Sequence, residues 1–409
     1  MNMHTDYERM LSRTDGHGWL KPDYRSMCLS NLPGYVAGML KGRGGVLPEA
    51  LNARRGVKNI LLVIADGMGL LNVRNRLDDL PFLRRMTDEG KIAPMTSVFP
   101  STTGAAMTSI FTGTEPVTHA LLEWFLFLDE AGMIIETLPF RAQNPAEQAQ
   151  FQNLDIHIRT LFEGEPATEN LAREGIECTA YLPENIVDSG FSVATHGSAA
   201  RKGYHTLDGI ISELVPAKKR STFTTLYYPE VDAAGHTYGP SSPEYLEEMR
   251  RVDGFLSELS VEMDEDTVIL LTADHGQIDV NPDETLYLDD LDWFDGMLAP
   301  KNGGGNIPPY GSPRDVIIRA KDAAVMCSRL NDRLGEFGVA KTSEWLTGEG
   351  YFGNGARSAK FETRAGSVWF LPHSGKTAWY RHYDGEHLAF KGVHGGMTPQ
   401  EILVPLAVI

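Results

Sequence analysis

The architecture of this chain is set by the segment Asn59-Ile60-Leu61-Leu62-Val63-Ile64-Ala65-Asp66-Gly67-Met68-Gly69. Its unbroken apolar run is typical of a strand buried on both faces, as in a parallel sheet covered by helices. In open parallel sheets, ligands bind beyond the carboxyl ends of the strands. Asp66 is predicted to lie at such an end, although a strand that stops at Asp-Gly is also typical of a plain turn.

Further apolar runs alternate with segments of helical spacing along the chain. Strands are predicted at residues 92–99, 178–182, 222–228 and 267–272. Helices are predicted at residues 77–90 and 105–111, before residue 175, and after the N-cap Ser242. Residues 121–128 and 133–140 flank Asp129-Glu130-Ala131-Gly132, which predicts a hairpin. The alternation indicates an α/β fold with a mainly parallel central sheet flanked by helices.

Three regions differ in composition. Residues 1–55 mix polar and apolar residues with several Gly and Pro, and are predicted to form an N-terminal arm. Residues 56–276 and 391–409 carry the strands and helices of the α/β core. Residues 277–390 lose this alternation and are rich in Asp, Gly, Pro and Tyr, so we expect an inserted cap or lid subdomain there.

Charge and cysteine content narrow the range of functions. The 409 residues carry a formal net charge of -18, which argues against a nucleic acid polymer as partner. A phosphate-bearing substrate would need metal ions or a local group of basic residues to reverse this field. Cys28, Cys178 and Cys327 are odd in number and far apart, so neither a disulfide framework nor a Cys-based metal motif is indicated.

The sequence favours a cytoplasmic location in a reducing compartment. Residues 1–10 are polar and lack the apolar core of a signal peptide. No stretch is long and apolar enough to span a membrane, so no membrane partner is expected. The oligomeric state stays open.

Acidic and imidazole side chains gather after the predicted strands. We expect Asp66, Asp232 and Asp274 to end three of them, with His236 and His275 close behind, and a sixth candidate is His394 between glycines. Zinc accepts carboxylate oxygen and imidazole nitrogen together. Six ligands suit a pair of ions about 3.5–4 Å apart that clamps the attacking and leaving oxygens of a displacement. The absence of cysteine favours zinc or manganese at a catalytic site.

A hydroxyl-rich turn supplies a candidate nucleophile. The segment Val98-Phe99-Pro100-Ser101-Thr102-Thr103-Gly104-Ala105 places three hydroxyls between a strand end and a helix start. The free N–H groups of a helix N-terminus are a natural seat for phosphate. A threonine there can lose its proton near a metal ion and attack phosphorus. An ordinary helix cap is the alternative.

The order of these motifs resembles the type I phosphodiesterase/nucleotide pyrophosphatase branch of the alkaline phosphatase superfamily. The likeness covers residues 57–275 and 390–409, including His394-Gly395-Gly396-Met397-Thr398-Pro399. It implies an alkaline-phosphatase-like sandwich and a phosphodiesterase that hydrolyses a small phosphoester, possibly a nucleotide. It also selects Thr103, three residues after Pro100, as the nucleophile that forms a covalent phosphothreonine.

The resemblance divides the ligands between two zinc ions. Asp232, His236 and His394 would hold one zinc. The other would be held by Asp66, Asp274 and His275, with Thr103 bridging into the site.

One position departs from the family pattern. The family places an Asn after its His-Gly-Ile segment to bind a phosphate oxygen, whereas Trp124 stands there in this chain. The backbone N–H of Thr103 is a substitute donor. The x-Pro-x-Arg continuation that sulfatases need is absent, which argues against a sulfatase.

Several alternatives stay open. The same motifs serve phosphomonoesterases, phosphonate hydrolases and phosphotransferases, although no Arg or Lys follows Thr103 closely, which favours diesters. The basic segment 201–205 is either a phosphate contact or a solvated loop. The aromatic side chains Trp124, Phe125 and Phe127 could stack a nucleobase or belong to the core. A metal-stabilised binding protein without turnover is the alternative from another class.

Overall fold

The structure is a computed structural model of the 409-residue chain that describes residues 3–42, 51, 57–214 and 221–409. The predicted boundary between the N-terminal arm and the core, at residues 55 and 56, lies outside these residues. The arm does more than lead into the core, because Leu20, Leu29 and Leu32 are fully buried in the main hydrophobic cluster.

A seven-stranded sheet in the order β2-β18-β9-β1-β8-β6-β7 forms the centre of the fold. Its strands are β1 (Asn59–Ala65), β2 (Ile92–Thr96), β6 (Glu177–Pro183), β7 (Ala200–Tyr204), β8 (Thr222–Tyr228), β9 (Thr267–Thr272) and β18 (Leu403–Val408). Strand β1 is buried along its whole length and pairs in parallel with both β8 and β9. The parallel α/β core predicted from the apolar run 59–65 is therefore confirmed.

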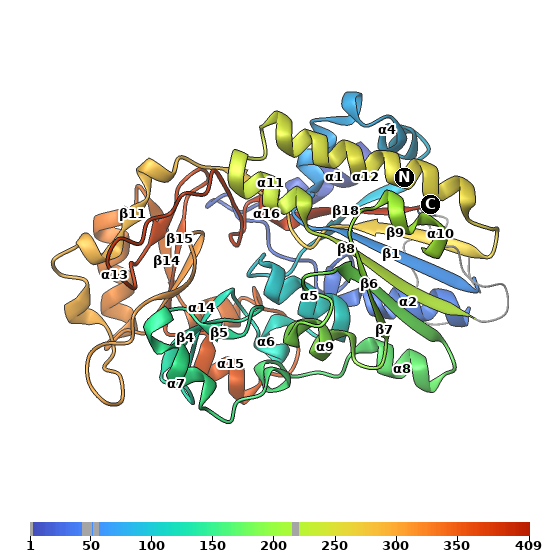
Figure 1. Ribbon diagram of the computed structural model, residues 1–409. Helices are drawn as coiled ribbons and strands as arrows, with labels where there is room; N and C mark the ends of the chain where they lie inside the picture. Colours follow the sequence, from blue (N-terminus) through green and yellow to red (C-terminus); the bar gives the residue numbers. More distant parts are fainter. Residues whose placement is uncertain (1–2, 43–50, 52–56, 215–220) are drawn as a thin grey trace.

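Helices cover both faces of this sheet, which explains why β1 is apolar on both sides (Figure 1). Helices α4, α11 and α12 lie on one side, and α2, α5, α8 and α9 lie on the other. The helices in the described parts of the core are α1 (Met3–Leu11), α2 (Leu32–Lys41), α3 (Leu70–Arg74), α4 (Pro81–Asp88), α5 (Thr103–Thr112), α6 (Pro116–His119), α7 (Gln148–Gln152), α8 (Ala167–Arg173), α9 (Gly190–His196), α10 (Ile211–Leu214), α11 (Glu230–Tyr238), α12 (Pro243–Glu262) and α16 (Pro399–Ile402).

A second seven-stranded sheet, in the order β14-β15-β13-β12-β3-β4-β5, is antiparallel throughout. Its strands are β3 (Phe125–Leu128), β4 (Met133–Glu136), β5 (Arg141–Ala142), β12 (Tyr310–Ser312), β13 (Asp315–Ile318), β14 (Gly338–Thr342) and β15 (Val368–Pro372). The helices α13 (Ala323–Leu334), α14 (Ser343–Gly348) and α15 (Ala359–Arg364) accompany it.

The second sheet joins two distant parts of the chain. The predicted hairpin is present as β3 and β4, and Phe125 of β3 pairs with Gly311 of β12. Residues 277–390 therefore share their sheet with residues 125–142 and contain regular strands and helices, where the sequence showed no alternation. Their role as a cap or lid remains a prediction.

Strand β18 is the second strand from one edge of the sheet and runs antiparallel to both of its neighbours, β2 and β9. The short helix α16 precedes it and begins with a capping box, in which Thr398 and Glu401 exchange hydrogen bonds with each other's backbone. This arrangement places residues 394–398 beside the carboxyl ends of β1 and β9, because Gly276 N–H donates to the Glu401 carbonyl at 2.9 Å.

Candidate active site

The carboxyl ends of β1 and β9 bring the first predicted site residues together. Ile64 is level with Thr272 in the sheet, so Asp66 and Asp274 follow adjacent strands at the same edge. The N–H of Gly67 donates to Asp274 Oδ1 at 3.1 Å. Gly67 has φ of 71°, and a Cβ there would lie 2.9 Å from the Cα of Asp232. The turn after β1 therefore needs glycine to approach the Asp232 backbone.

Asp232 corrects the prediction that three strands end in aspartate. Strand β8 ends at Tyr228, and Asp232 lies in the first turn of α11, with His236 one turn later. The helix places the two side chains on the same face at i and i+4. The expected ligand pair is therefore presented by a helix rather than by a strand end.

Four polar atoms converge at the end of β9. His275 Nε2 lies 3.1 Å from Thr103 Oγ1, 3.4 Å from Asp66 Oδ1 and 3.3 Å from Asp274 Oδ2. The aspartates and His275 are at most 2% exposed. Burial lowers the pKa of His275 to about 4, so these distances describe a neutral imidazole among carboxylates rather than ion pairs.

A second group of three side chains adjoins the first. His236 Nε2 lies 3.3 Å from Asp232 Oδ2, and His394 Nε2 lies 3.8 Å from Asp232 Oδ1. The rings of His275 and His394 stack with centroids 3.5 Å apart, which joins the two groups.

All three imidazoles are held in one tautomer. The Nδ1–H groups of His236, His275 and His394 donate to the backbone carbonyls of Gly392, Gly276 and Ser101, at 2.8, 3.2 and 3.0 Å. A carbonyl only accepts, so each Nδ1 carries the proton and each Nε2 presents a lone pair to the site. Outer hydrogen bonds of this kind orient histidines that bind metal ions.

The donor set fits metal ions. Asp66, Asp274 and His275 each offer a ligand atom within 4.8 Å of the others, and so do Asp232, His236 and His394. Asp66 Oδ1 and Asp274 Oδ2 are buried and have no hydrogen-bond partner in the described residues. Burial, then repulsion from Asp274 and Asp232, raises the pKa of Asp66 well above its usual value. A cation between these oxygens would remove both penalties.

Thr103 is the one hydroxyl of the turn that reaches this group. Ser101 Oγ donates to the Gly396 carbonyl at 2.8 Å, and Thr102 Oγ1 donates to the Leu122 carbonyl at 2.9 Å. Thr102 is the N-cap of α5, but its side chain makes no capping hydrogen bond. The simple helix-cap alternative therefore accounts for none of the three hydroxyls.

Two site residues could not be recognised from the sequence. The Tyr227 hydroxyl donates to Asp66 Oδ2, and the Gln277 amide donates to Asp232 Oδ1. Each orients a carboxylate of one group. Gln277 stands two residues after His275, and Tyr227 lies near the end of β8, so closeness to the motifs was the only available signal.

The loop that carries His394 is anchored by a buried ion pair. Arg314 donates to both oxygens of Glu401, at 3.0 and 3.2 Å, and the two side chains are at most 1% exposed. Glu401 also accepts hydrogen bonds from the N–H groups of Gly396 and Thr398. Arg314 precedes β13, so this pair fixes the second sheet to the His394 loop.

A second buried acid pair lies behind the site. Glu123 and Asp315 are fully buried and interact with each other, and Glu123 Oε1 and Asp315 Oδ2 have no other hydrogen-bond partner among the described residues, so a proton shared by the two carboxyls would satisfy both oxygens. Burial raises the pKa of Asp315 to about 7, and burial and Asp315 raise that of Glu123. Glu123 accepts the Trp124 N–H at 3.1 Å, and Asp315 accepts the Ser312 N–H at 3.1 Å.

Replacing Glu123 with glutamine should make the stability of the protein less dependent on pH. Free carboxyls ionise near pH 4. The folded wild type must keep its shared proton above that pH, so its stability falls as the pH rises from about 4 through about 7. The glutamine amide donates to Asp315 without titrating. Melting temperatures from pH 5 to 9 should show Glu123→Gln at least as stable as the wild type above pH 7, and equal pH slopes would contradict the shared proton.

Two cavities meet at Thr103. One, of about 430 Å³, is lined by α5, α9 and the end of β6. The other, of about 290 Å³, contains Asp232, His236 and His394. Thr103 and Trp124 line both cavities, and they are the only described residues shared between them. A molecule bound at Thr103 could therefore extend to either side of Trp124.

The aromatic residues after Trp124 and the basic segment 201–205, also singled out from the sequence, do not all lie at the site. Phe125 lines the smaller of these two cavities, whereas Phe127 is buried in the core. In the basic segment, Arg201 lies 3.6 Å from Asp188, and Lys202 donates to the Tyr181 hydroxyl at 3.0 Å. No described residue of segment 201–205 lines either cavity.

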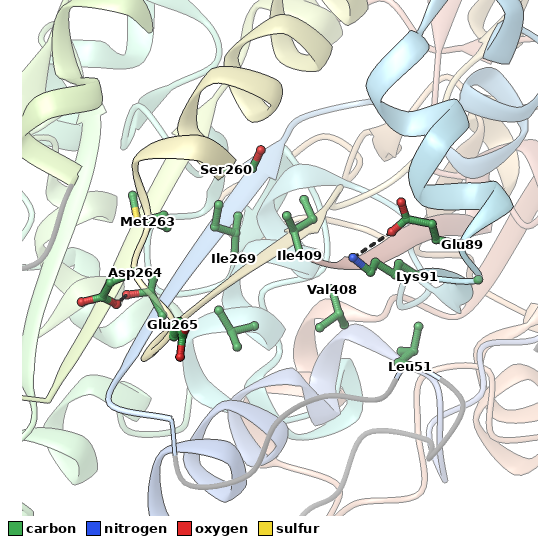
Figure 2. Close-up of a pocket in the computed structure, with 13 residues that line it drawn as sticks. Leu51, Glu89, Lys91, Ser260, Met263, Asp264, Glu265, Ile269, Val408 and Ile409 are labelled. Atoms are coloured by element: carbon green, nitrogen blue, oxygen red, sulfur yellow. Dashed lines mark hydrogen bonds and ion pairs between the residues drawn. The ribbon is translucent and has the colours of Figure 1, made fainter.

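Another cavity, of about 390 Å³, lies at the opposite edge of the central sheet (Figure 2). It is lined by residues at the start of β9 and the end of β18, away from the carboxyl ends of the parallel strands. Lys91 points to Glu89 there and pairs with it at 2.9 Å. None of the described site residues around Asp66 and Thr103 lines this cavity.

The fold and the paired Asp/His groups beside a threonine define the alkaline-phosphatase-like class of hydrolases. Within that class, the chain belongs to the type I phosphodiesterase / nucleotide pyrophosphatase family, whose model matches residues 60–397. Members of this family are hydrolytic enzymes that depend on metal ions. The resemblance found in the motifs is confirmed.

Individual relatives are distant. The venom phosphodiesterase of Crotalus durissus collilineatus is 24% identical over 267 residues, which cover 61% of this chain and 30% of the venom protein. A pyrophosphatase/phosphodiesterase of Schizosaccharomyces pombe is 25% identical over 210 residues, covering 47% of this chain and 39% of the yeast protein. The chain thus spans about a third of the length of these curated relatives.

Solved structures show the same fold. Murine ectonucleotide pyrophosphatase / phosphodiesterase 5 superposes with a TM-score of 0.60 and 16% identity, covering 85% of this chain and 87% of the murine chain. An inactive variant of that enzyme has been solved in complex with AMP and matches equally well.

Within the described residues of the present chain, no helix is long and apolar enough to cross a membrane.

Proposed function

We propose that this protein is a two-metal phosphodiesterase that acts through Thr103. The observation that carries the proposal is the position of Thr103 Oγ1, 3.1 Å from His275 Nε2, where Nε2 also faces Asp66 and Asp274. Asp66, Asp274 and His275 would hold one ion, and Asp232, His236 and His394 the other. Zinc suits these donors, and manganese is the alternative.

The reaction would proceed in two displacements. When bound, the two ions supply positive charge that acidifies the Thr103 hydroxyl and offsets charge on the phosphoryl and leaving oxygens. Thr103 Oγ1, having lost its proton to solvent, attacks phosphorus, and the bond to the leaving oxygen breaks as the phosphothreonine forms, so that the leaving group takes a proton from solvent and departs as the alcohol. A water molecule then attacks phosphorus, Thr103 regains a proton, and a phosphomonoester leaves.

The first turn of α5 supports both displacements. Its N–H groups, beginning with that of Thr103, have no acceptor within the helix and carry the positive end of the helix dipole. They are the donors that we assign to the phosphoryl oxygens, in the place of the family Asn.

Two observations favour diesters over monoesters. A diester has two substituents on phosphorus, and the two cavities extend from Thr103 on either side of Trp124. A monoester carries additional negative charge, and no Lys or Arg occurs among the described residues that line either cavity. The AMP complex of the murine neighbour supports a nucleotide-type substrate.

Cytoplasmic location remains a prediction from the sequence.

Paired chromogenic substrates test this proposal. Zinc-loaded protein should hydrolyse bis(4-nitrophenyl) phosphate with at least about tenfold higher kcat/KM than 4-nitrophenyl phosphate, because one poorly compensated charge costs on the order of 1 kcal/mol or more. The reverse preference would favour a phosphomonoesterase, and turnover of a phosphonate alone would favour a phosphonate hydrolase. Transfer to an added alcohol in place of water would indicate a phosphotransferase. Zinc-bound protein inactive on all of them would be a binding protein.

A further inference from the structure

His196 has one buried ring nitrogen without a hydrogen bond. It ends α9 and is 3% exposed, and its ring packs on Phe111 with centroids 4.2 Å apart. Nδ1 lies 2.9 Å from the Ser192 carbonyl of the same helix. Nδ1 is therefore the protonated nitrogen, and Nε2 is an acceptor with no partner among the described residues.

The residue that carries this acceptor, His196, belongs to the wall of the larger active-site cavity, the one of about 430 Å³. The cavity is mainly apolar, with Met107, Phe111 and Leu138 among its lining residues. Burial lowers the pKa of His196 to about 4, so the ring is neutral at ordinary pH. A buried acceptor that no group satisfies is unfavourable, which reserves Nε2 for something that enters the cavity.

The neighbouring hydroxyls do not compete for that role. Ser189 Oγ donates to Ser192 Oγ at 2.9 Å, and Ser192 Oγ donates to the Ile186 carbonyl at 2.8 Å. Both hydroxyls have partners within their own turn. His196 Nε2 is thus the buried polar atom that this wall leaves unpaired.

The cavity corresponds to one particular side of the substrate. Asp232, His236 and His394 line the smaller cavity on the other side of Trp124. That group would offset charge on the leaving oxygen, so the leaving alcohol lies with it. The substituent that stays on phosphorus after attack by Thr103 therefore extends into the larger cavity with His196.

We propose that His196 is a specificity-determining residue, whose Nε2 accepts a hydrogen bond from an N–H or O–H group on the retained arm of the diester. The rest of that arm is apolar and uncharged, as the cavity walls are. This inference rests on the proposed phosphodiesterase function. It deepens that function by adding a chemical requirement on one side of the substrate.

Matched aryl diesters test the requirement. The set consists of 4-nitrophenyl phenyl phosphate and its three analogues with a hydroxyl at position 2, 3 or 4 of the phenyl ring. In the wild type, at least one hydroxylated ester should have a kcat/KM about five- to tenfold above that of the phenyl ester, mainly through KM. His196→Phe keeps a ring against Phe111 but lacks the acceptor, so this ratio should fall to about one.

Two further variants make the result interpretable. His196→Gln retains an acceptor and should restore part of the preference if His196→Phe folds poorly, as melting temperatures would show. His157→Phe changes a histidine whose side chain is 79% exposed and should leave the ratio as in the wild type. If the wild type shows no preference, or His196→Phe keeps it, a water molecule or nothing occupies Nε2 and the inference is wrong. If the wild type hydrolyses none of the four esters, the proposed function itself fails.

Discussion

Thr103→Ala should reduce kcat/KM on bis(4-nitrophenyl) phosphate by roughly 10⁴-fold or more, the scale expected when a nucleophile is removed. Six carboxylate and imidazole ligands remain in this variant, so zinc content should stay close to that of the wild type. Acid quenching of the wild type during turnover should leave a phosphorylated peptide that contains Thr103, detectable by mass spectrometry. The variant should yield none.

The matched control is Thr108→Ala in the same helix. Thr108 is buried, and its hydroxyl donates to the Gly104 carbonyl at 2.7 Å, within α5 itself. Its loss should lower the melting temperature with little effect on kcat. Full turnover by Thr103→Ala with wild-type metal content would show that the nucleophile has been wrongly assigned.

Asp66→Asn should remove one of two bound ions and reduce turnover by roughly 10³-fold, because charge on the attacking oxygen loses its main compensation. Metal analysis should fall from about two zinc ions per chain to about one. In the absence of metal ions, by contrast, the same substitution should stabilise the folded protein. Burial, with Asp274 and Asp232 nearby, raises the pKa of Asp66, so this residue destabilises the metal-free fold at neutral pH, where the carboxyl of the unfolded chain is ionised. With chelator present, Asp66→Asn should therefore melt at a higher temperature than the wild type, and zinc should reverse this order.

Asp253→Asn is the matched control for this zinc-dependent reversal in the order of melting temperatures. Asp253 is also a buried aspartate, but it accepts hydrogen bonds from the N–H groups of Phe82 and Leu83 at the start of α4. Its replacement should lower the melting temperature by a similar amount with and without zinc. If Asp66→Asn binds two ions per chain and keeps full activity, Asp66 is a turn residue and no ligand.

The parallel core was predictable because local sequence and burial agree there. The runs 59–65, 222–228 and 267–272 are strands with the predicted bounds or nearly so, since continuous apolar residues suit strands covered on both faces. The seven proposed site residues also come together at one edge of this sheet, as expected from residues that follow parallel strands. The sequence predicts a strand end at Asp232 because the α11 helix is only nine residues long and has no apolar stripe to reveal it.

The second sheet could not be predicted beyond its β3–β4 hairpin, because the pairing of β3 with β12 joins segments almost 200 residues apart. Phe125 pairs with Gly311, and neither segment shows in its own sequence which partner it will have. The Glu123–Asp315 and Arg314–Glu401 pairs depend on the same long-range contacts. For the same reason, neither Trp124, which lines both cavities, nor His196, which lines the larger one, could be placed beside Thr103 in advance.

The position of β18 between the edge strand β2 and β9 has a consequence for synthesis on the ribosome. This strand, near the end of the sequence, lies between β2 and β9, so β2 has no place in the sheet until residues 403–408 have left the exit tunnel. His394 and Glu401 emerge at the same late stage. Translation of a shortened message that stops before them would leave Asp66, Asp274 and Thr103 without the loop that closes around them. A nascent chain can therefore bring the six proposed metal ligands together only after the segment 394–408 has been synthesised.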